Sequence, residues 1–257
     1  MVKGLYTAYT GLKNEQNRMD VMANNLANAS TVGFKKEGTT SQAFDDVLAY
    51  KLKDTSEAPN IPRRIGTMNM GVKIGENYTD YTQGSFRITD NTYDLALSGE
   101  GFFTVEFKNK AGETSTMYTR AGSFTLTEDG YLVTKDGDYV LGTNGRIKLD
   151  TLKDSRIASD GTIYQDDTAV AQLRITDFED YNYLEKYGET YYRPVEGAKT
   201  QNANVEVFSG YLEMSNVQVV SEMVNLISIT RAYESNQKIV QTYDSSLEIA
   251  ANQLGKL

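Results

Sequence analysis

Residues 219–254 read VVSEMVNLISITRAYESNQKIVQTYDSSLEIAANQL and carry an apolar side chain at every seventh position. The series is Val219, Leu226, Tyr233, Val240, Leu247 and Leu254. Ile229, Tyr243 and Ala250 follow members of the series by three residues, whereas the polar Glu222 and Asn236 interrupt this second line. Apolar residues at this spacing form a narrow stripe along one side of a helix, which is typical of a coiled coil. The pattern predicts a long C-terminal helix, roughly from residue 211 to residue 254, with a stripe that it cannot cover by itself.

A second helix is predicted near the N-terminus, over residues 3–28. Leu5, Leu12, Met19 and Leu26 repeat at the same interval of seven residues. A companion line of residues lies three positions after each of them, and Glu15 interrupts its apolar pattern. Isolated helices are marginal in water because nucleation is costly and an apolar stripe stays exposed. We therefore expect the two terminal helices to pair with each other and then with the same helices of other copies. A private helical hairpin within one chain is the alternative.

The middle of the chain has the pattern of β structure. Residues 123–127, 131–134 and 139–141 are short runs rich in aromatic and β-branched side chains. Asp-Gly and Asn-Gly pairs separate such runs, and these pairs supply the positive φ angles that tight hairpins need. The sequence therefore predicts an α+β fold with a mainly β body. Its predicted parts are an N-terminal coiled-coil helix (1–35), an extended connector (36–71), an antiparallel β domain (72–207) and a C-terminal coiled-coil helix (208–257).

Composition narrows the classes of function. The chain has 257 residues and a formal net charge of −9, which disfavours nucleic-acid binding because phosphates are bound by clustered Lys and Arg. Cysteine and histidine are both absent, so no disulfide or thiolate metal site is possible and the commonest general base is missing. There is no apolar stretch long enough to span a membrane and no secretory signal pattern. We expect no catalytic residues, no cofactor and no metal.

A few short motifs resemble nucleotide-binding, catalytic or calcium-binding sites, but each has a simpler explanation. Gly99-Glu100-Gly101 lacks the third glycine and the following helix of a nucleotide-binding turn, and it precedes a strand-like run. Asp45-Asp46, Asp166-Asp167 and Glu179-Asp180 are adjacent carboxylates in polar surroundings, not two groups facing each other as in a glycosidase. The aspartates beside glycines do not match a calcium-binding loop. Turns and solvated loops account for all of them.

The end of the N-terminal helix is unusual. Residues 23–35 read ANNLANASTVGFK, with three asparagines around the apolar stripe, although Asn is a poor residue in the middle of a helix. Gly33 is placed to end the helix in the left-handed conformation, and Phe34 would then pack back on the last turn.

Four segments carry a resemblance to a known family. They are ANNLANASTVGFK (23–35), DLALSGEGFF (94–103), YTRAGSF (118–124) and GYLEMSNV (210–217) with the following EMV, LI and RAYESN as far as residue 236. In this order they resemble the shared segments of the flagellar rod and hook family, and they bracket nearly the whole chain. Gln218 and Thr230 depart from the usual residues, which puts only contact details on the last helix in doubt.

The resemblance implies a structural subunit of the bacterial flagellar basal-body rod, most similar in length to distal rod subunits. A proximal rod or hook-type subunit is the close alternative. Such a subunit would assemble with copies of itself into a hollow, torque-transmitting tube between motor and hook, with paired terminal helices as the axial core. Its other partners would be further rod subunits, the hook or its adaptor, and the type III export apparatus. It would leave the cytoplasm without a cleaved signal and lie in the cell wall and periplasm. A peptidoglycan-acting enzyme and a surface-binding module are the alternatives from other classes.

The predicted functional residues are therefore assembly residues, not catalytic ones. Asparagines at seam positions are candidates for hydrogen bonds that set the register of the helices, as polar seam residues do in coiled coils. The complete set is Leu5, Leu12, Met19, Asn24, Asn25, Leu26, Asn28, Val219, Leu226, Tyr233, Asn236, Val240 and Leu247.

Overall fold

The computed structural model describes residues 2–51, 63–109 and 112–253. The chain divides into two compact units, and it passes between them four times. The first unit contains the residues up to Leu26, Glu37–Asp80 and the residues from Val219 onward. The second contains Ala27–Lys36 and Tyr81–Gln218. Both terminal helices thus belong to the same unit, and the β body is split between the two.

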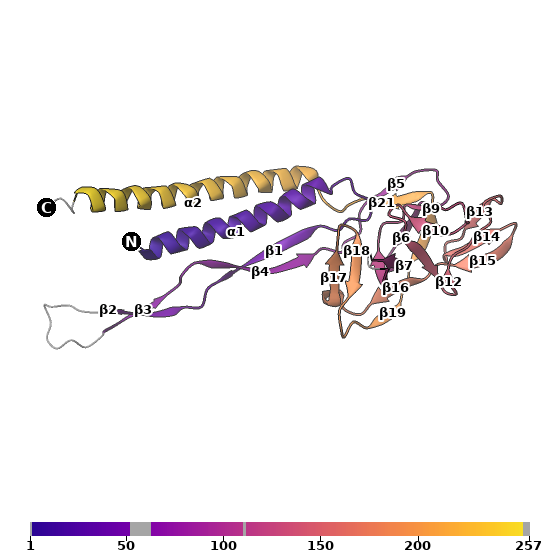
Figure 1. The fold of residues 1–257 in the computed structure, drawn as a ribbon, viewed down its shortest axis with the longest axis horizontal. Helices are drawn as coiled ribbons and strands as arrows, with labels where there is room; N and C mark the ends of the chain where they lie inside the picture. The colour runs from indigo at the N-terminus through magenta and orange to yellow at the C-terminus, as the bar shows by residue number, and fades with distance from the viewer. Residues whose placement is uncertain (1, 52–62, 110–111, 254–257) are drawn as a thin grey trace. The chain divides into compact units, whose positions relative to one another are not determined.

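The first unit is built on two helices, α1 (Val2–Ala27) and α2 (Val219–Gln253). They run antiparallel, side by side (Figure 1). The sequence pattern predicts both of them, and both are confirmed. The C-terminal helix begins eight residues later than predicted because Tyr211–Glu213 form a strand, β21. Glu222 lies in the first turn of α2, where a negative charge interacts favourably with the helix dipole.

Within the segment predicted as an extended connector, residues 36–71, the described residues contain three strands. Strand β1 (Glu37–Ala43) pairs antiparallel with β4 (Val72–Thr79), and β2 (Val47–Lys51) pairs with β3 (Arg63–Met68). The sequence of β1 is EGTTSQA, which has no large apolar side chain and shows no alternation, so its pattern predicts no strand there. Pairing with β4 and contacts with α1 hold this ribbon together.

Helix α1 is covered on two sides. Figure 1 shows it between α2 and the β1–β4 ribbon. On the ribbon side, the Asn14 side chain hydrogen-bonds Ser41 Oγ at 3.0 Å, and a Cβ built on Gly71 would meet Thr10 Oγ1 at 2.2 Å. Most of the buried residues of α1 are small or polar (Ala8, Thr10, Asn14 and Asn25), and among its described residues only Val21 is a larger buried apolar residue.

The second unit consists of short strands and one 3₁₀ turn. A ten-stranded antiparallel sheet follows the order β17-β18-β8-β7-β11-β10-β9, with β12 beside β11, β16 beside β7 and β19 beside β16. Three strands form a separate sheet, β13-β14-β15, and two pairs, β20-β6 and β21-β5, complete the unit. The bounds are β5 Phe86–Ile88, β6 Leu95–Ser98, β7 Phe102–Lys108, β8 Thr114–Thr119, β9 Phe124–Leu126, β10 Leu132–Thr134, β11 Tyr139–Gly142, β12 Gly145–Arg146, β13 Ser155–Ile157, β14 Thr162–Gln165, β15 Thr168–Gln172, β16 Ile175–Phe178, η1 Tyr181–Tyr183, β17 Leu184–Tyr187, β18 Tyr191–Pro194, β19 Thr200–Asn202, β20 Glu206–Ser209 and β21 Tyr211–Glu213.

Two apolar clusters fill this unit. The larger one is mostly aliphatic and includes Leu95, Leu97 and Ile163, all fully buried. The smaller one is aromatic: Phe102, Tyr118 and Tyr192 pack there with Phe178 and Leu184. Tyr118 and Phe178 meet edge to face with ring centroids 4.9 Å apart, a geometry that aromatic pairs favour. Tyrosine thus provides much of the aromatic packing in a chain without tryptophan.

The predicted Asp-Gly turns are confirmed. Gly130, Gly137 and Gly161 have φ angles of 82°, 92° and 79°, the left-handed conformation that these turns require. The turn at residues 135–138 also places two carboxylates beside a tyrosine. Tyr191 Oη lies 3.1 Å from Asp136 Oδ2 and 3.0 Å from Asp138 Oδ2.

Burial raises the pKa of Tyr191, and the nearby Asp138 and Asp136 carboxylates act in the same direction. A raised pKa means that the folded state holds the phenol proton more tightly than the unfolded chain does. The stabilisation from Tyr191 is therefore complete below the unfolded pKa of about 10 and is lost as the pH rises through the folded value.

We predict that the free energy of unfolding of the wild-type chain falls as the pH rises above about 10, and that Tyr191→Phe makes this fall shallower. The measurement is urea unfolding followed by circular dichroism at several pH values, with each protein compared with its own stability at pH 8. An equally steep fall in the variant would contradict the assignment to Tyr191.

Candidate assembly surfaces

One edge of α2 is turned toward α1. The companion line of the heptad pattern carries it: Glu222 and Ile229 are buried, and Asn236 and Tyr243 are half-buried. Side-chain atoms of Tyr243 and Asn236 approach the backbone of α1 at Gly4 and Gly11. The predicted series itself lies beside this edge, with Leu226, Tyr233 and Val240 half-buried and Val219 and Leu247 exposed.

A different face of α2 is apolar and exposed. Val220, Met223, Val224 and Ile227 are 78%, 47%, 58% and 54% exposed. The sequence prediction missed these residues because it followed a single line at seven-residue spacing. The signal was present in the doubled apolar residues Val219-Val220, Met223-Val224 and Leu226-Ile227, which place apolar side chains on two faces of one helix.

The predicted residues of α1 lie at the side of its buried face. Leu5, Leu12, Met19 and Leu26 are half-buried, and the deepest positions lie elsewhere on the helix. Of those positions, Asn14 and Asn25 bond to strand β1, which the sequence did not predict as a strand. Whether the leucines and Met19 contact other copies stays a prediction.

The predicted asparagines differ in their surroundings. Asn25 is fully buried and holds the backbone of Glu37 at two points: its Nδ2 donates to the Glu37 carbonyl at 2.7 Å, and its Oδ1 accepts from the Glu37 N–H at 2.9 Å. Asn28 is buried and accepts from Thr31 Oγ1 at 3.1 Å, whereas Asn24 is exposed. Asn25 thus fixes where strand β1 starts relative to α1, which is a role within one chain.

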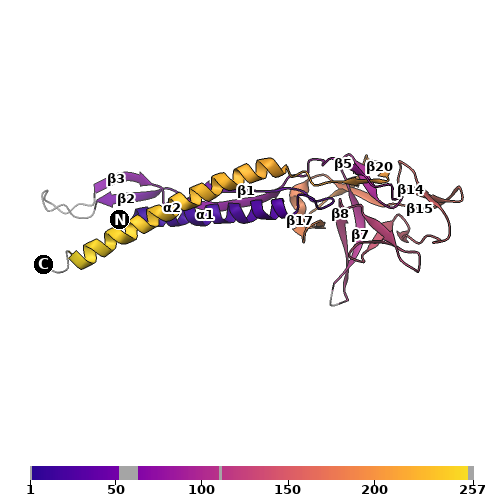
Figure 2. The ribbon, with the colours of Figure 1, turned by 90° about the horizontal axis from the view of Figure 1, so that it is seen from above.

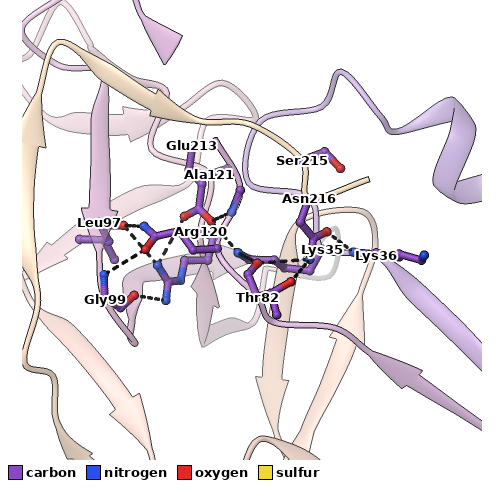
Figure 3. A network of polar contacts seen from close by, with 12 residues as sticks. Lys35, Lys36, Thr82, Leu97, Gly99, Arg120, Ala121, Glu213, Ser215 and Asn216 are labelled. Atoms are coloured by element: carbon purple, nitrogen blue, oxygen red, sulfur yellow. Dashed lines mark hydrogen bonds and ion pairs between the residues drawn. The ribbon is translucent and has the colours of Figure 1, made fainter. Parts of the chain in front are cut away.

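A buried ionic network lies in the second unit. Glu213, at the end of β21, has no exposed side-chain area, and its two carboxylate oxygens pair with Lys35 Nζ at 2.5 Å and Arg120 Nη1 at 3.4 Å. The Lys35 and Arg120 side chains are 1% and 5% exposed. Figure 3 shows these groups together with the surrounding residues Thr82, Leu97, Gly99 and Asn216.

Backbone groups complete the hydrogen bonding of these charges. Lys35 Nζ donates to the Thr82 carbonyl at 2.8 Å, Arg120 Nη2 donates to the Gly99 carbonyl at 2.6 Å, and the Gly84 N–H donates to Glu213 Oε1 at 3.0 Å. Ions removed from water are tolerated only when they are paired and hydrogen-bonded in this way. The network is therefore a point where several segments of the chain must all be in place.

Asn216 ties the same segments together beside the charges. Its Oδ1 accepts from the Lys36 N–H at 2.8 Å, and its Nδ2 donates to Thr82 Oγ1 at 3.0 Å. Lys36, Thr82 and Asn216 each lie within two residues of a point where the chain passes between the two units. Hydrogen bonds within the second unit thus join the chain segments next to three of the four points where the chain passes from one unit to the other.

Gly33 has a different role from the one predicted. Helix α1 ends at Ala27, so Gly33 does not cap it, although its φ of 71° is in the left-handed region. Its N–H donates to the Glu213 carbonyl at 2.8 Å, and a Cβ at this position would lie 2.3 Å from the Ala121 nitrogen. The next residue, Phe34, is fully buried with Lys186 Nζ 3.9 Å from its ring centroid. Gly33 is thus needed for a close approach of two backbones.

The short motifs that resemble binding or catalytic sites have structural roles here. Gly99 and Gly101 have φ angles of 112° and 149° and form the turn into β7, as predicted. Asp166 and Asp167 lie in a turn with positive φ angles of 49° and 61°, and Asp180 caps the 3₁₀ turn by accepting from the Asn182 N–H. None of the carboxylate groups among the described residues is arranged as a metal site. Across that same part of the chain, no helix is long and apolar enough to cross a membrane.

Family models match the three parts of the chain that meet in the ionic network. A model described as flagella basal body rod protein matches residues 5–35, which include Lys35. The D1 domain of the flagellar hook protein FlgE/F/G matches residues 96–165, which include Arg120. The C-terminal region of flagellar basal body rod FlgEFG proteins matches residues 209–254, which include Glu213 and Asn216.

The FlgG basal-body rod protein of Bacillus subtilis (strain 168) is 35% identical over 272 aligned residues, which cover 98% of this chain and 99% of that relative. The chain belongs to the flagellar basal-body rod family. The FlgF rod protein of Caulobacter vibrioides is 33% identical with 97% of this chain covered, and the hook-basal body complex protein FlhO of B. subtilis is 31% identical with 100% covered. Coverage in the FlgF and FlhO relatives is 98% and 100% of their own lengths.

Membership of the flagellar basal-body rod family gives the general function. The chain is a structural subunit of the rod of the flagellar basal body, in a family of structural proteins and not of enzymes. The resemblance inferred from the four sequence segments is thereby confirmed. Three of the four segments contribute charged groups to the ionic network, and the remaining one, residues 94–103, contributes the Leu97 and Gly99 carbonyls.

We predict that Glu213→Gln lowers the free energy of unfolding by about 3–5 kcal/mol, because Lys35 and Arg120 would remain buried without a counter-ion. Urea unfolding followed by circular dichroism measures this loss. The matched control is Glu185→Gln, which removes the carboxylate of the exposed Arg193–Glu185 pair and should cost at most about 1 kcal/mol. Equal losses in the two variants would show that burial of the network contributes nothing.

Proposed function

We propose that this rod subunit polymerises with copies of itself into a hollow tube, with the α1–α2 pair as the axial core. The tube would lie in the periplasm and cell wall, join the motor to the hook and transmit torque. Export through the flagellar type III apparatus without a cleaved signal is part of the same proposal. The further partners would be other rod subunits and the hook or its adaptor.

The exposed apolar face of α2 carries this proposal. Val220, Val224 and Ile227 recur at helical spacing, so they form one row, and Met223 lies next to it. Burying each such side chain against a neighbouring subunit would contribute about 1.5–3 kcal/mol. A row of this kind on a helix that already has a partner on another face supports contact with a second subunit.

We favour the distal rod position. Several relatives that match nearly the whole chain are FlgG proteins, at 35% identity in B. subtilis and 32% in Agrobacterium fabrum. The FlgF relative at 33% identity supports the proximal rod position as the alternative.

We predict that Val224→Glu abolishes polymerisation and motility while the isolated subunit stays folded, because a charge would be buried at each repeated contact. Swimming in soft agar and pelleting of polymer measure the loss, and circular dichroism checks the fold. Gln241→Glu is the matched control, since it adds one charge at another exposed position of α2. Normal motility in Val224→Glu would overturn the role of this face.

The rod position is tested by complementation. We predict that the gene for this chain restores motility to a strain of its own species that lacks this subunit, and that purified basal bodies from cells with a tagged copy carry the tag on the hook side of the rod. Labelling by electron microscopy distinguishes the two positions. A tag found only at the motor side would favour the proximal assignment and contradict the distal one.

A further inference from the structure

Two glycines of α1 receive side chains of α2. A Cβ built on Gly4 would lie 2.3 Å from Tyr243 Oη and 2.8 Å from Tyr243 Cζ. A Cβ built on Gly11 would lie 3.1 Å from Asn236 Nδ2 and 3.6 Å from Asn236 Cγ. Both glycines therefore act as notches, since a larger residue at either position would displace the side chain that occupies it.

The two contacts share one register. Seven residues forward on α1, from Gly4 to Gly11, correspond to seven residues back on α2, from Tyr243 to Asn236. The helices run antiparallel in Figures 1 and 2 as well. One further heptad in the same register brings Arg18 opposite Ile229, which is the only strongly buried apolar side chain among the described residues of α2.

A heptad pattern alone does not choose this register. The apolar series on α2 repeats over six positions, so a shift by seven residues would leave an apolar stripe against α1. The glycines break this degeneracy because they are not repeated: Arg18 takes the next position on α1. A shift of one heptad in one direction would place Asn236 against Arg18, and a shift in the other would place Asn236 against Gly4 and leave Tyr243 without α1 beneath it.

We propose that Gly4 and Gly11 are specificity-determining residues that fix the register and rotation of the α1–α2 pair. Glycine is, after proline, the least favourable residue in a helix interior, so propensity does not explain Gly11, which lies about three turns into α1. By fixing the rotation of α2, the notches also determine that Val220, Val224 and Ile227 are the row left exposed. That last consequence rests on the proposed function, whereas the register does not.

The chain contains no cysteine, which allows a direct test by disulfide formation in the full-length protein. Ala8 lies midway between the two glycines, and Val240 lies midway between their partners, so Ala8→Cys with Val240→Cys reports the proposed register. Ala8→Cys with Tyr233→Cys reports a shift of one heptad. We expect the first pair to form a disulfide under mild oxidation of dilute protein and the second pair to form little.

The decisive test of the proposal replaces both glycines with a larger residue. Gly4→Leu with Gly11→Leu raises helix propensity and should nevertheless reduce the disulfide of the 8–240 pair several-fold. Adding Tyr243→Ala and Asn236→Ala should restore it, because the displaced side chains are then gone. Ala23→Leu, at an exposed position of α1, is the matched control and should leave the yield unchanged.

Each outcome bears on the proposal. An unchanged yield in the Gly4→Leu, Gly11→Leu variant, or equal yields for the 8–240 and 8–233 pairs in the parent chain, would overturn it. The oxidation is done on dilute, unpolymerised protein, so its result does not depend on rod assembly. Suppose that the Gly4→Leu, Gly11→Leu variant loses the disulfide and still supports swimming. The role of the glycines in the helix register would then stand, and only the link between register and rod assembly would be rejected.

Discussion

A carboxylate with no access to water has to be matched by cations and by hydrogen-bond donors, and Glu213 imposes this requirement on the second unit. Lys35 comes from the segment after α1, Arg120 from the segment after β8, and Gly84 from the segment before β5. Breaking such a pair costs far more than forming it gains, because the remaining charges stay buried. The network therefore contributes less to stability than to specificity. Its charges are all paired only when segments that are distant in the sequence adopt one arrangement.

The helical unit follows a complementary rule. Its helices are held by shape, with notches, small side chains and polar contacts on α1, and in the described part of α2 the edge toward α1 carries the buried residues. Apolar residues that recur at every seventh position predict both helices, because periodicity is a local property of the sequence. The same pattern does not reveal which face is inside the chain and which is free, since that depends on the β1–β4 ribbon lying against α1.

How far the sequence could predict the fold depends on the range of each interaction. The helices and the Asp-Gly turns follow from neighbouring residues and were predictable, as were the four segments shared with the rod family. Strand β1 was not, because its residues are polar or small and its partner β4 lies about thirty residues away. The ionic network was not either: Lys35 and Glu213 each look like an ordinary surface residue, and nothing local signals that they pair.

Lys35 and Glu213 are separated by 178 positions in the chain. Contacts between such remote residues are slow to form, because a long loop has to close before any of their stabilisation is gained. During synthesis from the N-terminus, the lysine emerges early and has no carboxylate to meet until most of the polypeptide has left the ribosome. The second unit of the nascent chain therefore cannot close until Glu213 has left the ribosome.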